Sequence, residues 1–169
     1  MKGAFCTLVV AVLIVFAPGQ TSKDSGSGDE AAIRTLEQNF AQAVKAKDVD
    51  KIMSAYEHSA KLVIFDVIPP REYAGWDAYK KDWQDFLASF QGPITFEISG
   101  LNVTTVGNLA YGYSFQRVAG KGSDGSAVNM TVRVTDVYRK IDGKWPVVHE
   151  HVSVPVDLKT GKADLQSKP

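Results

Sequence analysis

The sequence predicts an α+β fold in which three N-terminal helices pack on one face of a strongly curved, mostly antiparallel sheet. Three observations support this class. Apolar residues in the first half recur at spacings of three and four, the second half is rich in β-branched residues between short turns, and 44% of the chain is hydrophobic. Helices facing such a sheet form a cone-shaped half-barrel, and its open end is expected to be a mostly apolar pocket.

Residues 1–19 are predicted to be a signal peptide. Lys2 precedes a continuous apolar run over 4–17, shorter than the roughly 20 residues that a membrane span needs, and Gly19 lies where small residues allow cleavage. An uncleaved membrane anchor is the alternative. We therefore expect a secreted or periplasmic protein that has no membrane attachment after cleavage.

Charge and cysteine content exclude several classes of protein. Lys plus Arg is 19 and Asp plus Glu is 19, so the chain has no net basic charge for binding nucleic acid. The single cysteine, Cys6, lies in the predicted leader, so the mature chain would contain no disulfide and no thiolate ligand. No phosphate-binding, zinc-protease or serine-hydrolase motif occurs in the sequence, and neither a metal nor a cofactor is expected.

The predicted domain spans 29–157, between a flexible linker over 20–28 and a polar tail over 158–169. A first helix begins at Asp29, and its apolar stripe consists of Ile33, Leu36, Phe40 and Val44. A short second helix follows a capping aspartate. The third helix begins after Gly75 and places Trp83 on its apolar face. The predicted strands are 61–68, 94–106, 109–118, 127–141 and 144–156.

Two carboxylates stand out when side chains are assigned to alternating strand faces. Asp136 shares a face with apolar and aromatic residues, and Glu150 shares a face with valines. A buried charge without a partner is costly, so each is a candidate to bind a polar group of a ligand. For Asp136, pairing with a nearby arginine is the alternative.

A third carboxylate, Asp66, interrupts an apolar strand just before Pro69-Pro70. A carboxylate at an apolar pocket mouth has a raised pKa and can act as a general base. The alternative is that Asp66 caps a turn.

Histidines and tyrosines on the later strands allow more than one interpretation. His149 and His151 are predicted on the face opposite Glu150, where they could share a metal ion or a proton relay, or serve a structural or interface role. Tyr111 and Tyr113 belong to an aromatic strand face that is expected in the core or in the pocket wall.

The stretches over 134–145 (VTDVYRKIDGKW) and 148–153 (VHEHVS) resemble the SnoaL-like and ketosteroid-isomerase-like branches of the nuclear-transport-factor-like superfamily. The same ending is similar to the association domain of calcium/calmodulin-dependent kinases, which is an oligomerisation module. The resemblance to ketosteroid isomerase implies that Asp66 is the catalytic base and that Asp136 is a protonated acid that donates to an enolate oxygen.

Phe40 occupies the position of that family's oxyanion-hole tyrosine, so Tyr56 or Tyr138 would have to reach the same space. We expect a pocket for a small apolar molecule that can carry a carbonyl group, with cofactor-free isomerase- or lyase-like proton transfer. A non-catalytic dimerisation domain is the alternative, and the resemblance implies a homodimer. The expected ligand-contacting residues are Glu150, Tyr56, Trp83, Tyr111, Tyr113, Tyr138, His149 and His151.

Overall fold

The computed structural model describes residues 25–167, and the predicted signal peptide lies outside them. Three helices form, α1 over Ser25–Ala46, α2 over Val49–Met53 and α3 over Trp76–Ala88. Helix α1 starts four residues before the predicted Asp29, within the predicted linker. Among the described residues, no helix is both long enough and apolar enough to cross a membrane.

The six strands form one sheet in the order β2-β1-β6-β5-β4-β3. Neighbouring strands are antiparallel except β1 and β6, which are parallel. The short β2 was not predicted, and β3 begins four residues earlier than expected. The bounds are β1 Val63–Phe65, β2 Tyr73–Ala74, β3 Phe90–Val106, β4 Leu109–Gly122, β5 Ala127–Arg139 and β6 Val147–Ser153.

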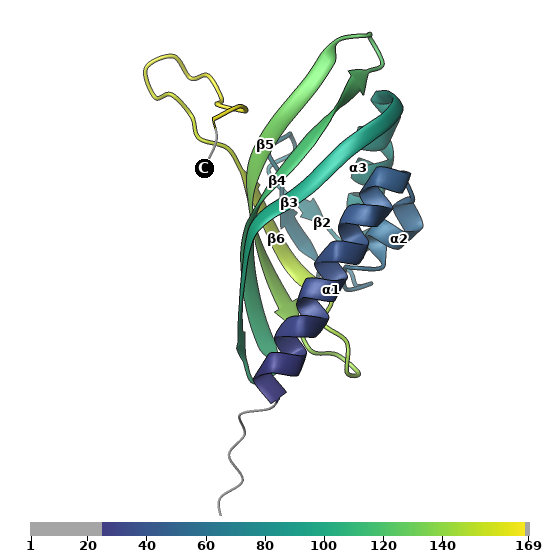
Figure 1. Cartoon of the computed structure of the whole chain (residues 1–169), viewed down its shortest axis with the longest axis vertical. Helices are drawn as coiled ribbons and strands as arrows, with labels where there is room; N and C mark the ends of the chain where they lie inside the picture. The colour runs from purple at the N-terminus through teal and green to yellow at the C-terminus, as the bar shows by residue number, and fades with distance from the viewer. Residues whose placement is uncertain (1–24, 168–169) are drawn as a thin grey trace, which may run out of the picture.

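The three helices cover one face of the curved sheet, as predicted (Figure 1). The core lies between these layers and is rich in aromatic rings. Phe40 of α1 makes edge-to-face contacts with Tyr56, Trp83 and Phe96, at centroid distances of 6.1, 5.6 and 5.8 Å. Through these rings, α1 packs against α3, against the segment after α2 and against the inner face of β3.

Strand β4 turns its small and polar residues inward and its large aromatic residues outward. Tyr111 is 47% exposed and Tyr113 is 50% exposed, so the prediction that they lie in the core or pocket wall is wrong. The reason is the neighbouring strand, because Tyr138 of β5 fills the space over Gly112. A Cβ atom at Gly112 would lie 3.1 Å from the Tyr138 hydroxyl.

A β-bulge interrupts the alternation of side chains in β6. The pairing with β5 shifts between Val137 and Tyr138, so that Tyr138 pairs with Val147. As a result, Val147 and Glu150 are both buried, although strict alternation would put them on opposite faces.

The C-terminal segment folds back beside β5 on the side of the sheet away from the helices (Figure 1). The Thr131 N–H donates to the Leu165 carbonyl oxygen at 2.8 Å, and Val156 forms an antiparallel bridge with Ala163. The predicted polar tail over 158–169 is therefore hydrogen-bonded to the domain within its described part.

Candidate ligand pocket

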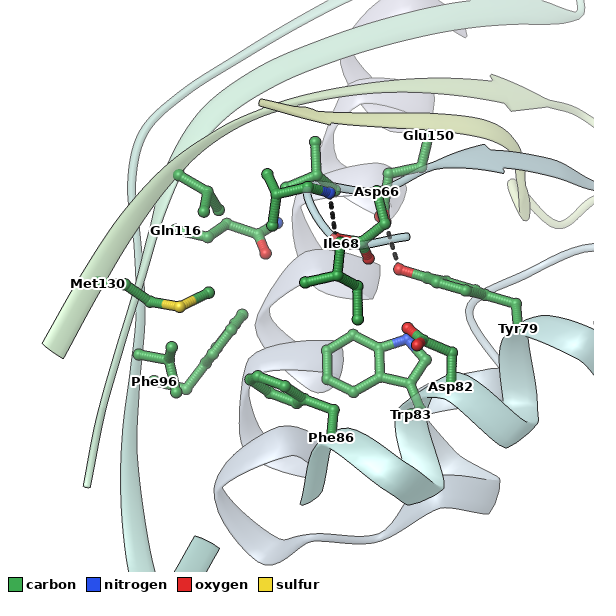
Figure 2. Close-up of a pocket in the computed structure, with 14 residues that line it drawn as sticks. Asp66, Ile68, Tyr79, Asp82, Trp83, Phe86, Phe96, Gln116, Met130 and Glu150 are labelled. Carbon is green, nitrogen blue, oxygen red and sulfur yellow. Dashed lines mark hydrogen bonds between the residues drawn. The ribbon is translucent and has the colours of Figure 1, made fainter. Parts of the chain in front are cut away.

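A cavity of about 80 Å³ lies between α3, the β1–β2 connection and the inner faces of β3–β6. Figure 2 shows the acidic residues and Tyr79 on one side of the cavity, with Gln116, Phe96 and Met130 across from them. The lining residues are Asp66, Val67, Ile68, Tyr79, Asp82, Trp83, Phe86, Phe96, Gln116, Val118, Met130, Val132, Glu150 and Val152.

Asp66 lies at the cavity directly after β1, and its carboxylate accepts a hydrogen bond from the Val67 N–H (Figure 2). Burial raises the pKa of Asp66 to about 6, and the negative charge of Glu150 contributes to the rise. The ionised and neutral forms of this carboxyl are therefore both accessible near neutral pH, which suits a general base.

Glu150 is 4% exposed and accepts hydrogen bonds from two tyrosines. The Tyr79 hydroxyl donates to Oε1 at 2.6 Å, and the Tyr56 hydroxyl donates to Oε2 at 2.8 Å. Burial raises the pKa of Glu150, whereas the two hydroxyl groups lower it by stabilising the carboxylate. The two tyrosine hydroxyl groups thus favour the ionised form of Glu150, whereas burial, the larger effect, favours the neutral form.

Asp136 pairs with Glu150 across β5 and β6 and is 2% exposed. Burial, followed by the charges of Glu150 and Glu37, raises the pKa of Asp136 well above its usual range. Burial therefore favours the neutral form of Asp136, which is the form that the resemblance to ketosteroid isomerase implies. Asp136 is not among the residues that line the cavity, whereas its pairing partner Glu150 is.

Glu37 of α1 is a third buried carboxyl group beside Asp136 and Glu150. The Tyr138 hydroxyl donates to Glu37 Oε1 at 2.8 Å and lies 3.4 Å from Asp136 Oδ2. Burial raises the pKa of Glu37 to about 7, while the bond from Tyr138 lowers it. A chain of acid and phenol groups thus runs through the core from Glu37 to Glu150.

Two polar side chains at the cavity have no hydrogen-bond partner among the described residues. Gln116 is 8% exposed and points its amide into the cavity (Figure 2). The indole Nε1 of Trp83 is buried and also unpaired. Buried polar groups are normally paired, so these two are available to a ligand.

Comparison with known proteins identifies the family of this chain. Residues 33–157 match the model of the SnoaL-like domain. The chain belongs to the SnoaL-like domain family. A structure of an NTF2-like protein of unknown function from Pseudomonas putida KT2440 is 33% identical, with a TM-score of 0.76 over 85% of this chain and 98% of that chain.

Two more distant structures share the fold of this SnoaL-like domain. A nuclear transport factor 2 (NTF2-like) superfamily protein from Salmonella enterica serovar Typhimurium LT2 is 18% identical, with a TM-score of 0.71 over 82% of this chain and 99% of its own. A ketosteroid isomerase-like protein from Erwinia carotovora is 17% identical, with a TM-score of 0.61 over 73% and 93%. No functionally curated protein matches the sequence.

The SnoaL-like domain brings together Asp66, Trp83 and Glu150 at the cavity. Tyr56 does not line the cavity but donates a hydrogen bond to Glu150. His149 and His151 lie on the opposite face of the sheet from Glu150, where they flank the ring of Phe65 at 5.1 and 5.7 Å. Like Tyr111 and Tyr113, these histidines do not line the cavity.

Four residues of this region were not predicted as site residues from the sequence: Glu37, Tyr79, Asp82 and Gln116. Glu37 lies four residues after Ile33 and therefore falls on the apolar stripe of α1, a signal that could have identified it. Gln116 shares the inner face of β4 with the buried Ser114 and Val118, but the aromatic residues on the outer face of that strand predict the opposite orientation. Within residues 25–167, no three His, Cys, Asp or Glu side chains form a group that could hold a metal.

Proposed function

We propose that this SnoaL-like domain is exported, binds a small carbonyl compound in the cavity and moves a proton on it without a cofactor. The observation that carries the proposal is Asp66, a carboxyl group with a pKa of about 6 at an aromatic cavity. A carboxylate with this pKa is a stronger base than an ordinary one and is still ionised at pH 7. The ketosteroid isomerase-like neighbour is consistent with such chemistry.

In the proposed reaction, the Asp66 carboxylate removes a proton from the carbon next to the carbonyl group. The electron pair of that C–H bond moves to the carbonyl oxygen, and the Gln116 amide donates a hydrogen bond to it. Asp66 then returns the proton to a different carbon of the conjugated enolate. Gln116 thereby takes the role at the oxygen that the family resemblance gave to Asp136.

The remaining polar groups adjust the base in this proposal. The charge of Glu150 raises the pKa of Asp66. Tyr56 and Tyr79 hold that charge in place through their hydroxyl groups. Asp136, which pairs with Glu150 and does not line the cavity, is a positioning residue rather than a group that contacts substrate.

The size of the cavity restricts the substrate. A volume of about 80 Å³ is well below the roughly 300–1,000 Å³ of pockets for drug-sized ligands. A steroid does not fit it as it stands, so the proposed substrate has a single small ring or a short chain. The probe 3-cyclopentenone has this size and isomerises to 2-cyclopentenone by the same proton transfer.

The test is the isomerisation rate of 3-cyclopentenone, followed by ultraviolet absorbance of the conjugated product. The rate of the wild-type protein should rise with pH through about 6 as Asp66 ionises. Asp66→Asn should reduce it by roughly 100-fold or more, the usual contribution of a general base. Asp77→Asn is the matched control, because Asp77 is exposed on α3 and lies outside the cavity. Equal rates for Asp66→Asn and the wild type would refute the proposal.

A second candidate, self-association, is favoured by the outer face of the sheet. Leu109, Tyr111 and Tyr113 are each about half exposed there, and Val106, which pairs with Leu109, is 71% exposed. We propose that this patch joins two copies of the chain as a homodimer. Sedimentation velocity should give a dimer for the wild type and a monomer for Tyr113→Lys. A wild-type monomer at high concentration would refute this candidate.

A further inference from the structure

We propose that the molecule bound in the cavity is a cation, namely a small protonated amine with an apolar body. This inference rests on the proposed function, because it assigns a substrate class to the same cavity. It depends on the charge balance of the cavity wall, on the aromatic rings in that wall and on the unpaired amide of Gln116.

The cavity wall contains three acidic side chains and no basic one. Asp66, Asp82 and Glu150 line it, and none of its described lining residues is Lys, Arg or His. Asp66 and Asp82 take part in no ion pair of the described chain. The two interact, since the charge of Asp82 raises the pKa of Asp66. A bound cation would relieve this repulsion.

Nearby basic side chains are already engaged elsewhere. Lys81, whose charge acts on Asp82, is exposed and forms an ion pair with Asp85 at 2.7 Å. The nearby Tyr73 hydroxyl, which is neutral and donates to the Pro69 carbonyl oxygen at 3.1 Å, lowers the pKa of Asp82 against the effect of burial. Among the described residues, the three cavity carboxyls therefore have no ion-pair partner.

The rest of the wall suits the apolar body of an amine. Trp83 and Phe86 lie beside Asp82 on α3, and Phe96 faces them across the cavity (Figure 2). The faces of such rings attract organic cations, and Trp does so most strongly. Carboxylates beside aromatic rings thus match an ammonium group attached to a small hydrocarbon.

Gln116 provides an independent indication that a polar ligand is bound. Gln116 is 8% exposed, and its amide points into the cavity without a hydrogen-bond partner among the described residues (Figure 2). An amide can donate to a carbonyl oxygen and accept from an N–H group. The cavity therefore offers carboxylates for a cation at one side and an amide for a second polar atom at the other.

The test compares three probes of equal chain length: n-butylammonium, 1-butanol and butanoate. Binding is measured at pH 7.5 by titration of the folded protein, with the indole N–H signal of Trp83 followed by ¹H–¹⁵N NMR. The ammonium probe should bind at least 10-fold more tightly than the alcohol, and butanoate should bind more weakly than either. Asp82→Asn and Asp66→Asn should each reduce the preference for the ammonium probe to less than 3-fold, whereas Asp77→Asn should leave it unchanged.

Several outcomes would overturn the inference. Equal affinity for the ammonium and alcohol probes would refute the cation-binding inference, and the isomerisation of 3-cyclopentenone would still decide the proposed function. A preference for the ammonium probe that persists in both Asp82→Asn and Asp66→Asn would also refute the inference, because the cation would then bind elsewhere. If no probe moves the Trp83 signal and 3-cyclopentenone is not isomerised, the inference and the proposed function both fail. Unfolding midpoints of the variants establish that each is folded.

Discussion

Replacing Glu37 by Gln should make the protein more stable at alkaline pH. Glu37 is 4% exposed, and burial raises its pKa from the ordinary 4.5 to about 7. A carboxyl group with a raised pKa stabilises the fold below pH 4.5, and that stability is lost as the pH rises toward 7. Glutamine is nearly isosteric, stays neutral, and its side-chain oxygen can still accept the hydrogen bond from Tyr138.

The magnitude follows from the change in pKa. A rise from 4.5 to about 7 corresponds to about 3 kcal/mol of unfolding free energy. The stability difference between Glu37→Gln and the wild type should therefore shift by about 3 kcal/mol in favour of the variant between pH 4.5 and pH 8.5. Most of the change should occur between pH 5 and pH 7.5.

Urea unfolding followed by tryptophan fluorescence at a series of pH values measures this difference. Glu72→Gln is the matched control, because Glu72 is exposed in the loop before β2 and its substitution should have the same effect at every pH. If the difference between Glu37→Gln and the wild type is the same at pH 5 and pH 8.5, the argument that Glu37 is ionised in the core at a cost is refuted.

Three further predictions concern other parts of the chain. Tyr79→Phe removes a hydrogen-bond donor to the buried Glu150 and should destabilise the fold by about 1.5–3 kcal/mol in chemical unfolding. The loss should be larger at pH 8 than at pH 5, because this hydrogen bond favours the ionised carboxylate. Gly112→Ala should lower stability by about 1–3 kcal/mol, because the new methyl group meets Tyr138; a thermal melt identical to the wild type would contradict the packing argument. Intact mass spectrometry of protein exported by a bacterial host should show that residues 1–19 are removed, and a full-length mass would contradict the signal-peptide prediction.

The regular parts of the chain could be predicted from the sequence because their periodicity is regular. Strand β5 keeps strict alternation, so Asp136 and Tyr138 were assigned correctly to the inner face. The bulge in β6 has no such signature, and for this reason the burial of Val147 beside Glu150 was not foreseen. Alternation likewise places residues on two faces but does not say which face is inside.

The face of β4 was assigned wrongly for that last reason. Its apolar and aromatic residues suggested the core, yet the inside of the cone is filled from other elements, by Tyr138 and by the rings of α3. The site was found only in part for a related reason. Asp66 and Glu150 stood out against apolar neighbours, whereas Asp82 and Gln116 acquire their significance from a cavity that depends on tertiary packing.

The hydrogen bond from Thr131 to Leu165 has a consequence for solubility. The described pairing of β5 with β6 ends at Arg133 and Ser153, so the first residues of β5 would have a free edge on that side. The C-terminal segment covers this edge by pairing with Thr131. Unpaired strand edges invite pairing with other chains, so the segment protects the sheet against aggregation. A chain shortened to residue 157 would keep the whole matched family domain but would leave this edge of β5 open to pairing with other chains.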